Sequence, residues 1–363
     1  MISDVLSDEF YLTMAQALDS HGIGFIQFTQ SSASSNDEGI GMGRDMDFNT
    51  QLAKQSNHSV LYNALVAHEQ AIEPLRIQLR WLNDMVEQGI PVYGQAATVR
   101  APFTINFKDW NLFDDNETWR EATLGTVEEK RTKLADPNRR KPMRAEYDAG
   151  TPARDFIFGE LHKFIAITIN NPELREKYLN QSVGKIAKRE NKHVIDVILD
   201  ISVADDLEAE WLGPVVNGDA QVHKEMMSSP VAIPGSSDGG AHIKFLTLGV
   251  YPTDMLTWLV RDTHSLTLEE AHFRLSALPA WAAQFKDRGI LREGLAADIV
   301  VYDLANLKLL PVEVAHDLPA GEWRRVQKAE GYRHIMVNGV ETVRDGNCTG
   351  ATPGGLLRRG RAA

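Results

Sequence analysis

The chain has 363 residues, 43% of them hydrophobic, with 27 glycines and 15 prolines. This composition is typical of a globular protein with a large core, built as one large domain with an accessory one or as two medium domains. The formal net charge is −12 and no long basic run occurs, so we expect no nucleic-acid or anionic-membrane surface.

A single cysteine, Cys348, excludes an internal disulfide framework. The start, "MISDVLSDEF", has neither a basic n-region nor a long apolar core, and no window reaches about 18 uncharged apolar residues. The sequence therefore predicts a cytoplasmic protein with no membrane span.

Three helix-then-strand units open the chain. A helix at 8–20 precedes "GIGFIQFTQ", a helix near 45–56 precedes "SVLYNALV", and a helix at 70–88 precedes "GIPVYGQAATV". We interpret each apolar run as a buried strand, apolar on both faces. Such strands favour a parallel sheet covered by helices.

This rhythm breaks between about residues 100 and 230, where the chain is charged, aromatic and loop-rich. Within that segment the pattern predicts a helix at 126–135, a strand in "HKFIAITIN", and helices near 172–189 and 192–200. The segment interrupts the helix-then-strand order.

The rhythm resumes at "SSPVAIPGSSD", a predicted strand with Asp238 at its C-terminal end, followed by a helix-rich stretch at 252–286. The tail contains "GILREGLAADIVVYDLANL" and "GYRHIMVNGVETVRDG", which are short β runs with Gly and Asn-Gly turn signals. We interpret the tail as a small β module.

Polar side chains follow the predicted strands, where catalytic residues of parallel α/β proteins gather. They are Gln27, Asn63, Gln95 and Asp238. As a residue pattern, Asp238 beside two glycines fits a metal ligand or general base, and it equally fits a helix N-cap. His242, four residues on, is either a partner of Asp238 or a structural histidine.

The chain contains no HxH, HExxH or CxxC motif, so by itself it builds no obvious zinc site. Cys348 has no neighbouring histidine, which disfavours a nucleophile.

Several stretches carry a family resemblance. "PGSSDGGAHI" resembles the strand-eight aspartate motif of the amidohydrolase superfamily, and "GILREGLAADIVVYDL" with "HIMVNGVETVRDG" resembles its C-terminal β-sandwich return. "GIPVYGQAATVRAP", "ADPNRRKPMR" and "DLPAGEWRRVQKAEGYRHIMVNGVETVRDGNCTGATPGGLLR" are similar to the N-acyl-D-amino-acid deacylase branch, the D-aminoacylase-like group of amidohydrolase family 3. The resemblance runs over nearly the whole chain.

The resemblance implies an α/β fold, a partial TIM (β/α)8 barrel of strands five to eight with an insertion subdomain and a C-terminal β-sandwich piece. It divides the chain into the first barrel part (1–100), the insertion (101–230), the last barrel strand with its helices (231–287) and the sandwich segment with the tail (288–363).

The implied activity is hydrolysis of the C–N amide bond of an N-acyl-amino acid, in particular an N-acyl-D-amino acid, by a water that a divalent metal such as zinc activates. By the same resemblance Asp238 is metal ligand and general base, with His242 supporting it. Arg100 is a candidate for the substrate carboxylate, or else forms a salt bridge to the insertion.

The chain also departs from the family pattern. Gln27 and Asn63 stand where the resemblance implies histidines on strands five and six, and amides are poor zinc ligands. Strands one to four and their HxH pair have no counterpart here. We expect a piece of a longer enzyme, one subunit of a split enzyme, or a pseudoenzyme; a homo-oligomer or a partner that supplies the missing barrel half would cover the open strand edges. A hydrolase of cyclic amides is a further alternative.

Overall fold

The protein is represented by a computed structural model that describes residues 6–22, 24–29, 43–67, 72–109, 111, 113, 116–150, 158–240 and 242–357. A four-stranded parallel sheet lies at its centre, with strand order β1-β2-β3-β7. Its strands are β1 (Ile26–Thr29), β2 (Val60–Val66), β3 (Val92–Ala97) and β7 (Ala232–Gly235). The α/β class and the parallel sheet are as predicted.

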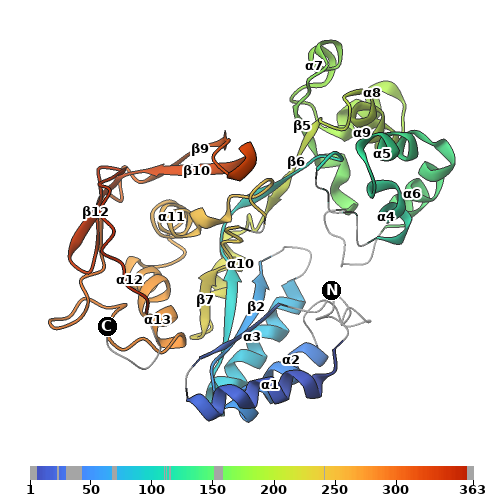
Figure 1. The fold of residues 1–363 in the computed structure, drawn as a ribbon. Coiled ribbons are helices and arrows are strands. Elements are labelled where there is room, and N and C mark those ends of the chain that lie inside the picture. Colours follow the sequence, from blue (N-terminus) through green and yellow to red (C-terminus); the bar gives the residue numbers. More distant parts are fainter. Residues whose placement is uncertain are drawn as a thin grey trace.

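Helices α1 (Asp8–His21), α2 (Arg44–Ser56) and α3 (Ile72–Glu87) lie together on one side of this sheet (Figure 1). Each occurs where the apolar spacing predicts it. In α3 the buried side chains Leu75, Leu79 and Leu82 recur at helical intervals and join the main core with Val60 and Val92 of the sheet. The other face carries a smaller apolar cluster with the helix α13 (Leu278–Ala282).

The prediction of a buried first strand is wrong. The residues of β1 alternate between half-buried and exposed, because β1 pairs only with β2 and forms an edge of the sheet within the described part of the chain. A run that is apolar on both faces does not reveal whether a strand has one neighbour or two.

The segment between β3 and β7 forms a second unit with its own core. Strands β4 (Ala101–Ile105), β6 (Glu210–Val216) and β5 (Ile165–Thr168) form an antiparallel sheet in the order β4-β6-β5. Around them lie η5 (Phe158–Lys163), α4 (Glu117–Thr123), α5 (Val127–Ala135), α6 (Pro137–Ala149), α7 (Pro172–Tyr178), α8 (Val183–Glu190) and α9 (Val194–Ala204). The α10 helix (Ala220–Met226) leads back towards β7.

The prediction of a loop-rich segment therefore contains too few helices and strands. Aromatic side chains such as Phe113, Trp119 and Trp211 are fully buried in its core, whereas charged residues such as Glu128 and Lys141 are exposed on its helices. The predicted helix near 172–189 is two helices, because Leu179 to Ser182 form the break between α7 and α8.

The chain after β7 is helical and then β-rich, as predicted. Its helical segments are η6 (Leu248–Val250), α11 (Tyr251–Asp254), the π-helical η7 (Met255–Asp262), α12 (Leu268–His272), the π-helical η8 (Phe273–Ala277) and α13. The β module contains β8 (Ile299–Tyr302), β9 (Lys308–Ala315), η9 (Pro319–Gly321), β10 (Arg324–Glu330), β11 (Tyr332–Val337), β12 (Val340–Arg344) and β13 (Asn347–Cys348). The antiparallel ribbon β9–β10 has no counterpart in the prediction.

Where the chain is described, no helix is long and apolar enough to cross a membrane.

Arg274 of η8 forms hydrogen bonds with the segment that leads into β7. Its guanidinium is buried and donates to the carbonyl oxygens of Ser229 (3.0 Å), Ala232 (3.1 Å) and Met227. Burial lowers the pKa of the Arg274 guanidinium, while Glu270 opposes that change. The side chain therefore satisfies three carbonyl groups of buried residues at the start of the last parallel strand.

Replacing Arg274 by methionine should lower the free energy of unfolding by about 3 kcal/mol, because buried carbonyl groups lose their donors. Arg333, whose side chain is 52% exposed, provides the control, and Arg333→Met should change stability by less than about 1 kcal/mol. Urea unfolding measures both. Equal losses in the two variants would contradict this role of Arg274.

Candidate functional site

The polar residues at the strand ends lie side by side. In the parallel register Asn63 is opposite both Thr29 and Gln95. Gln27 Nε2 donates to Gln95 Oε1 at 2.5 Å, across the strand that carries Asn63. Asn63 Oδ1 accepts a hydrogen bond from Ser236 Oγ at 3.0 Å. The structure thus joins the predicted residues of β1, β2 and β3 and connects them to the loop after β7.

These amides are hydrogen-bonded to neighbouring side chains, and neutral amides are weak ligands for zinc. They can donate to and accept from the polar groups of a small substrate. The arrangement therefore fits a polar binding surface better than a set of metal ligands.

Asp238 lies in the exposed loop after β7. Its side chain is 40% exposed, and Asp238 Oδ2 is 3.9 Å from His242 Nε2. The backbone N–H of His242 donates to the Asp238 carbonyl oxygen at 3.3 Å. The helix N-cap interpretation is wrong, because the next helical segment is η6. The accessible carboxylate can contact a cation or accept a proton.

The described residues do not form a complete zinc site. Asp238 and His242 are two ligand types that zinc accepts, but structural and catalytic zinc sites use three or four protein donors. No group of three or more His, Cys, Asp or Glu side chains able to hold a metal occurs in the part of the chain that the structure describes. The remaining ligands of a zinc ion would have to come from outside the described residues.

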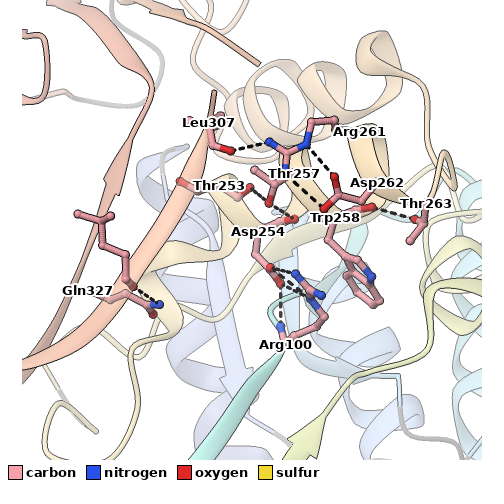
Figure 2. A network of polar contacts seen from close by, with 11 residues as sticks. Arg100, Thr253, Asp254, Thr257, Trp258, Arg261, Asp262, Thr263, Leu307 and Gln327 are labelled. Atoms are coloured by element: carbon pink, nitrogen blue, oxygen red, sulfur yellow. Dashed lines mark hydrogen bonds and ion pairs between the residues drawn. The ribbon is translucent and has the colours of Figure 1, made fainter. Parts of the chain in front are cut away.

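Arg100 belongs to a network around Asp254 (Figure 2). Arg100 Nη2 donates to Asp254 Oδ1 at 2.7 Å, and the Arg100 backbone N–H donates to Asp254 Oδ2 at 2.9 Å. The guanidinium lies 4.4 Å from the centre of the Trp258 ring. The expected salt bridge thus exists, but its partner is on α11 rather than in the insertion.

Two buried residues of this network, Asp254 and His223, have no signal in the sequence that marks a functional site. Asp254 is almost fully buried, and His223 on α10 is buried against Trp258 with ring centres 5.0 Å apart. His223 Nδ1 lies 2.9 Å from the Asp219 carbonyl oxygen, while its Nε2 is buried with no hydrogen-bond partner in the described structure. No motif marks either residue; the only signal in the sequence is that His223 precedes Met226 by three residues, the spacing of one helix face.

Burial lowers the pKa of His223, and Arg100 adds to this, while the Asp219 backbone bond and the charges of Asp254 and Asp219 oppose it. Since the unfolded chain binds the proton near the ordinary pKa of about 6.5, the folded protein should lose stability as the pH falls below that value.

We expect the free energy of unfolding to fall between pH 7 and pH 5, and His223→Met to reduce that slope by up to about 1.4 kcal/mol per pH unit. The exposed His316 provides the control, because His316→Met leaves the buried ring in place. Urea unfolding across this pH range measures the slopes. An unchanged slope in His223→Met would show that another group causes the acid sensitivity.

Comparison with known proteins defines the class. The amidohydrolase family profile matches residues 114–349. The chain therefore belongs to the amidohydrolase family, and its relatives lie in the D-aminoacylase-like branch. Over 111 residues it is 34% identical to N-acyl-D-aspartate deacylase of Alcaligenes xylosoxydans xylosoxydans, a match that covers 30% of this chain and 20% of that enzyme.

Solved structures show the same fold. A D-aminoacylase superposes with a TM-score of 0.51 at 15% identity, covering 95% of this chain and 58% of the other. An N-acyl-D-glutamate deacylase of Bordetella bronchiseptica, complexed with zinc and a phosphonate mimic of the tetrahedral intermediate, superposes with a TM-score of 0.51 at 16% identity, covering 95% and 59%. A D-aminoacylase with a binuclear metal centre gives the same TM-score at 15% identity, again covering 95% and 58%. The chain spans less than two thirds of the length of each of these relatives.

Proposed function

We propose that this chain is the C-terminal part of a metal-dependent amidohydrolase that hydrolyses the C–N amide bond of N-acyl-amino acids, in particular N-acyl-D-amino acids. The observation that carries the proposal is the place of Asp238, an accessible carboxylate directly after the last parallel strand of an amidohydrolase-family fold. The deacylase relatives support the substrate class.

The single exposed cysteine supports a reducing cytoplasmic location.

In this proposal Asp238 accepts a proton from the attacking water and passes it to the leaving nitrogen. The water oxygen bonds to the acyl carbon, the C–N bond breaks, and a carboxylate and an amine leave. His242 supports Asp238, and Gln27, Asn63 and Gln95 bind the polar groups of the substrate. Arg100 is the proposed contact for the substrate carboxylate, although Asp254 already occupies part of its guanidinium.

A divalent metal, which we propose to be zinc, would polarise the acyl carbonyl and lower the pKa of a bound water. Asp238 is the residue of this chain that would hold it, together with donors from outside the described residues.

Asp238→Asn should reduce kcat/KM for N-acyl-D-amino acids by about 100-fold or more, because the amide cannot serve as a base. Asp206 is a matched control: it too is an exposed aspartate with positive φ, so Asp206→Asn should leave the rate unchanged. Metal analysis and hydrolysis of an N-acyl-D-amino-acid panel with added zinc measure the effect. Full activity of Asp238→Asn would overturn the role of this residue.

A second candidate is a non-catalytic assembly subunit on the amidohydrolase scaffold, which the incomplete donor set of the described residues favours. Such a subunit would contain no metal and would hydrolyse nothing in the panel. A cyclic-amide hydrolase would instead open hydantoin-like rings, so one such substrate belongs in the panel.

The sheet edges support the proposal that another chain completes the barrel. Within the described residues β1 and β7 are both edges of the parallel sheet.

The β module also presents an uncovered apolar face. On it Val300 and Val343 pair with Ile335, and Val337 pairs with Val340. The side chains of Val300 and Val340 are 50% and 46% exposed. Soluble monomers rarely leave such a face uncovered. We propose that a second copy, or a partner that supplies the missing barrel half, covers these surfaces.

Sedimentation of the purified chain should then give a mass above the 40.4 kDa of one copy, and Val300→Lys should reduce it, because a charge cannot be buried at an apolar contact. Val86, an exposed valine on α3, provides the control Val86→Lys. A wild-type mass of one copy would contradict self-association and leave the separate partner, which co-purification from the native source would identify.

A further inference from the structure

We propose that the ion pair of Arg325 with Glu210 positions the loop that carries Asp238 and His242. Through this pair the placement of the loop depends on the antiparallel sheet β4-β6-β5 and on the ribbon β9–β10. The inference rests on the proposed function only in giving Asp238 a chemical role; the placement itself follows from the contacts.

Arg325 forms hydrogen bonds with the loop just after His242. Its backbone N–H donates to the carbonyl oxygen of Ile243 at 2.7 Å, and its Nε donates to that of Lys244 at 2.8 Å. One residue of β10 thus binds two consecutive carbonyl groups, which fixes both the position and the orientation of that peptide segment.

The same guanidinium reaches the insertion. Arg325 Nη2 donates to Glu210 Oε1, and Glu210 Oε2 accepts from Thr168 Oγ1 at 2.7 Å. Glu210 begins β6 and Thr168 ends β5, so the carboxylate is held by a neighbouring strand. The side chains of Arg325 and Glu210 are only 10% and 17% exposed. A largely buried charge pair of this kind is costly to break, because either charge left alone stays desolvated.

Further contacts hold the loop from both sides. The backbone N–H of Thr104 in β4 donates to the Phe245 carbonyl oxygen at 3.2 Å. Thr247 Oγ1 donates to Gln327 Oε1 at 2.8 Å, and Gln327 Nε2 donates to the Leu310 carbonyl oxygen in the ribbon at 2.9 Å. The loop therefore lies between the insertion sheet and the ribbon, with Arg325 in contact with both.

Local backbone bonds transmit this placement to the carboxylate. The N–H groups of Phe245 and Leu246 donate to the His242 carbonyl oxygen at 3.1 and 3.0 Å, and the His242 N–H donates to the Asp238 carbonyl oxygen. Fixing Ile243 and Lys244 thus fixes the turn on which Asp238 lies. Arg325 and Glu210 are positioning residues, since both act on Asp238 through the backbone.

Arg324, the preceding residue of β10, is a matched control. It pairs with Asp317 at 2.7 Å, but those side chains are 40% and 49% exposed, and no contact of Arg324 with the loop is found in the described structure. An exposed pair of this kind contributes little to stability.

Hydrogen exchange, read by mass spectrometry without metal or substrate, tests the proposal. In Arg325→Met the amides of residues 242–247 should exchange about 10-fold faster or more, while β2 and β3 stay unchanged. Glu210→Leu should do the same, and the double variant should add little, because the two side chains act as one unit. Arg324→Met should leave the loop at the wild-type rate.

If Arg325→Met does not fold, Arg325→Lys keeps the charge but loses the planar fork, and should give a smaller increase in the same residues. Unchanged loop exchange in the Arg325 variants, exchange that rises equally in β2 and β3, or strictly additive effects of the two substitutions would each overturn the proposal. The exchange measurement needs no catalysis, so it tests the placement of the loop independently of activity. If the wild-type protein and the control Asp206→Asn were both inactive on the substrate panel, the proposed function would be refuted and the exchange result would still stand.

Discussion

The buried carboxylate of Asp254 is the constraint on which the rest of the structure depends. It accepts hydrogen bonds from both the backbone and the guanidinium of Arg100, at the point where the chain leaves β3 for the insertion (Figure 2). The helix that carries Asp254 also contacts the β module, since Thr253 Oγ1 is 2.7 Å from Tyr332 Oη. Without Arg100 the carboxylate would be a buried, unpaired charge, so the pair fixes how three parts of the chain meet.

The candidate site lies where those parts converge. The parallel sheet supplies the amides at its strand ends, while the loop with Asp238 is held by residues of the insertion and of the ribbon. In the proposed function the strand ends contact the substrate, while a loop with its own supporting contacts places the charged group.

Helical periodicity predicted α1, α2 and α3, because each helix buries an apolar stripe, and short apolar runs predicted the four parallel strands. The same periodicity predicted α5, α7, α8 and α9 in the insertion but not α4 or α6, where charged residues outnumber the apolar positions that reach the core. The family resemblance, rather than the residue pattern, made Asp238 the candidate ligand and base; the structure excludes the helix cap, and its chemical role stays a prediction. Partners such as Arg100 and Asp254, or Arg325 and Glu210, lie 154 and 115 residues apart, and no local pattern connects residues at that separation.

The amides at the strand ends limit the chemistry that this chain can perform by itself. A histidine offers an unshared nitrogen pair to a metal, whereas Gln27, Asn63 and Gln95 are neutral and already share donors and acceptors with each other or with Ser236. A metal at this surface would have to replace those hydrogen bonds with weak carbonyl contacts. A substrate amide could exchange hydrogen bonds one for one at little cost. The strand ends of this chain are therefore suited to recognition of polar groups. In the proposed function, the charge for catalysis would come from Asp238 and from ligands outside the described residues.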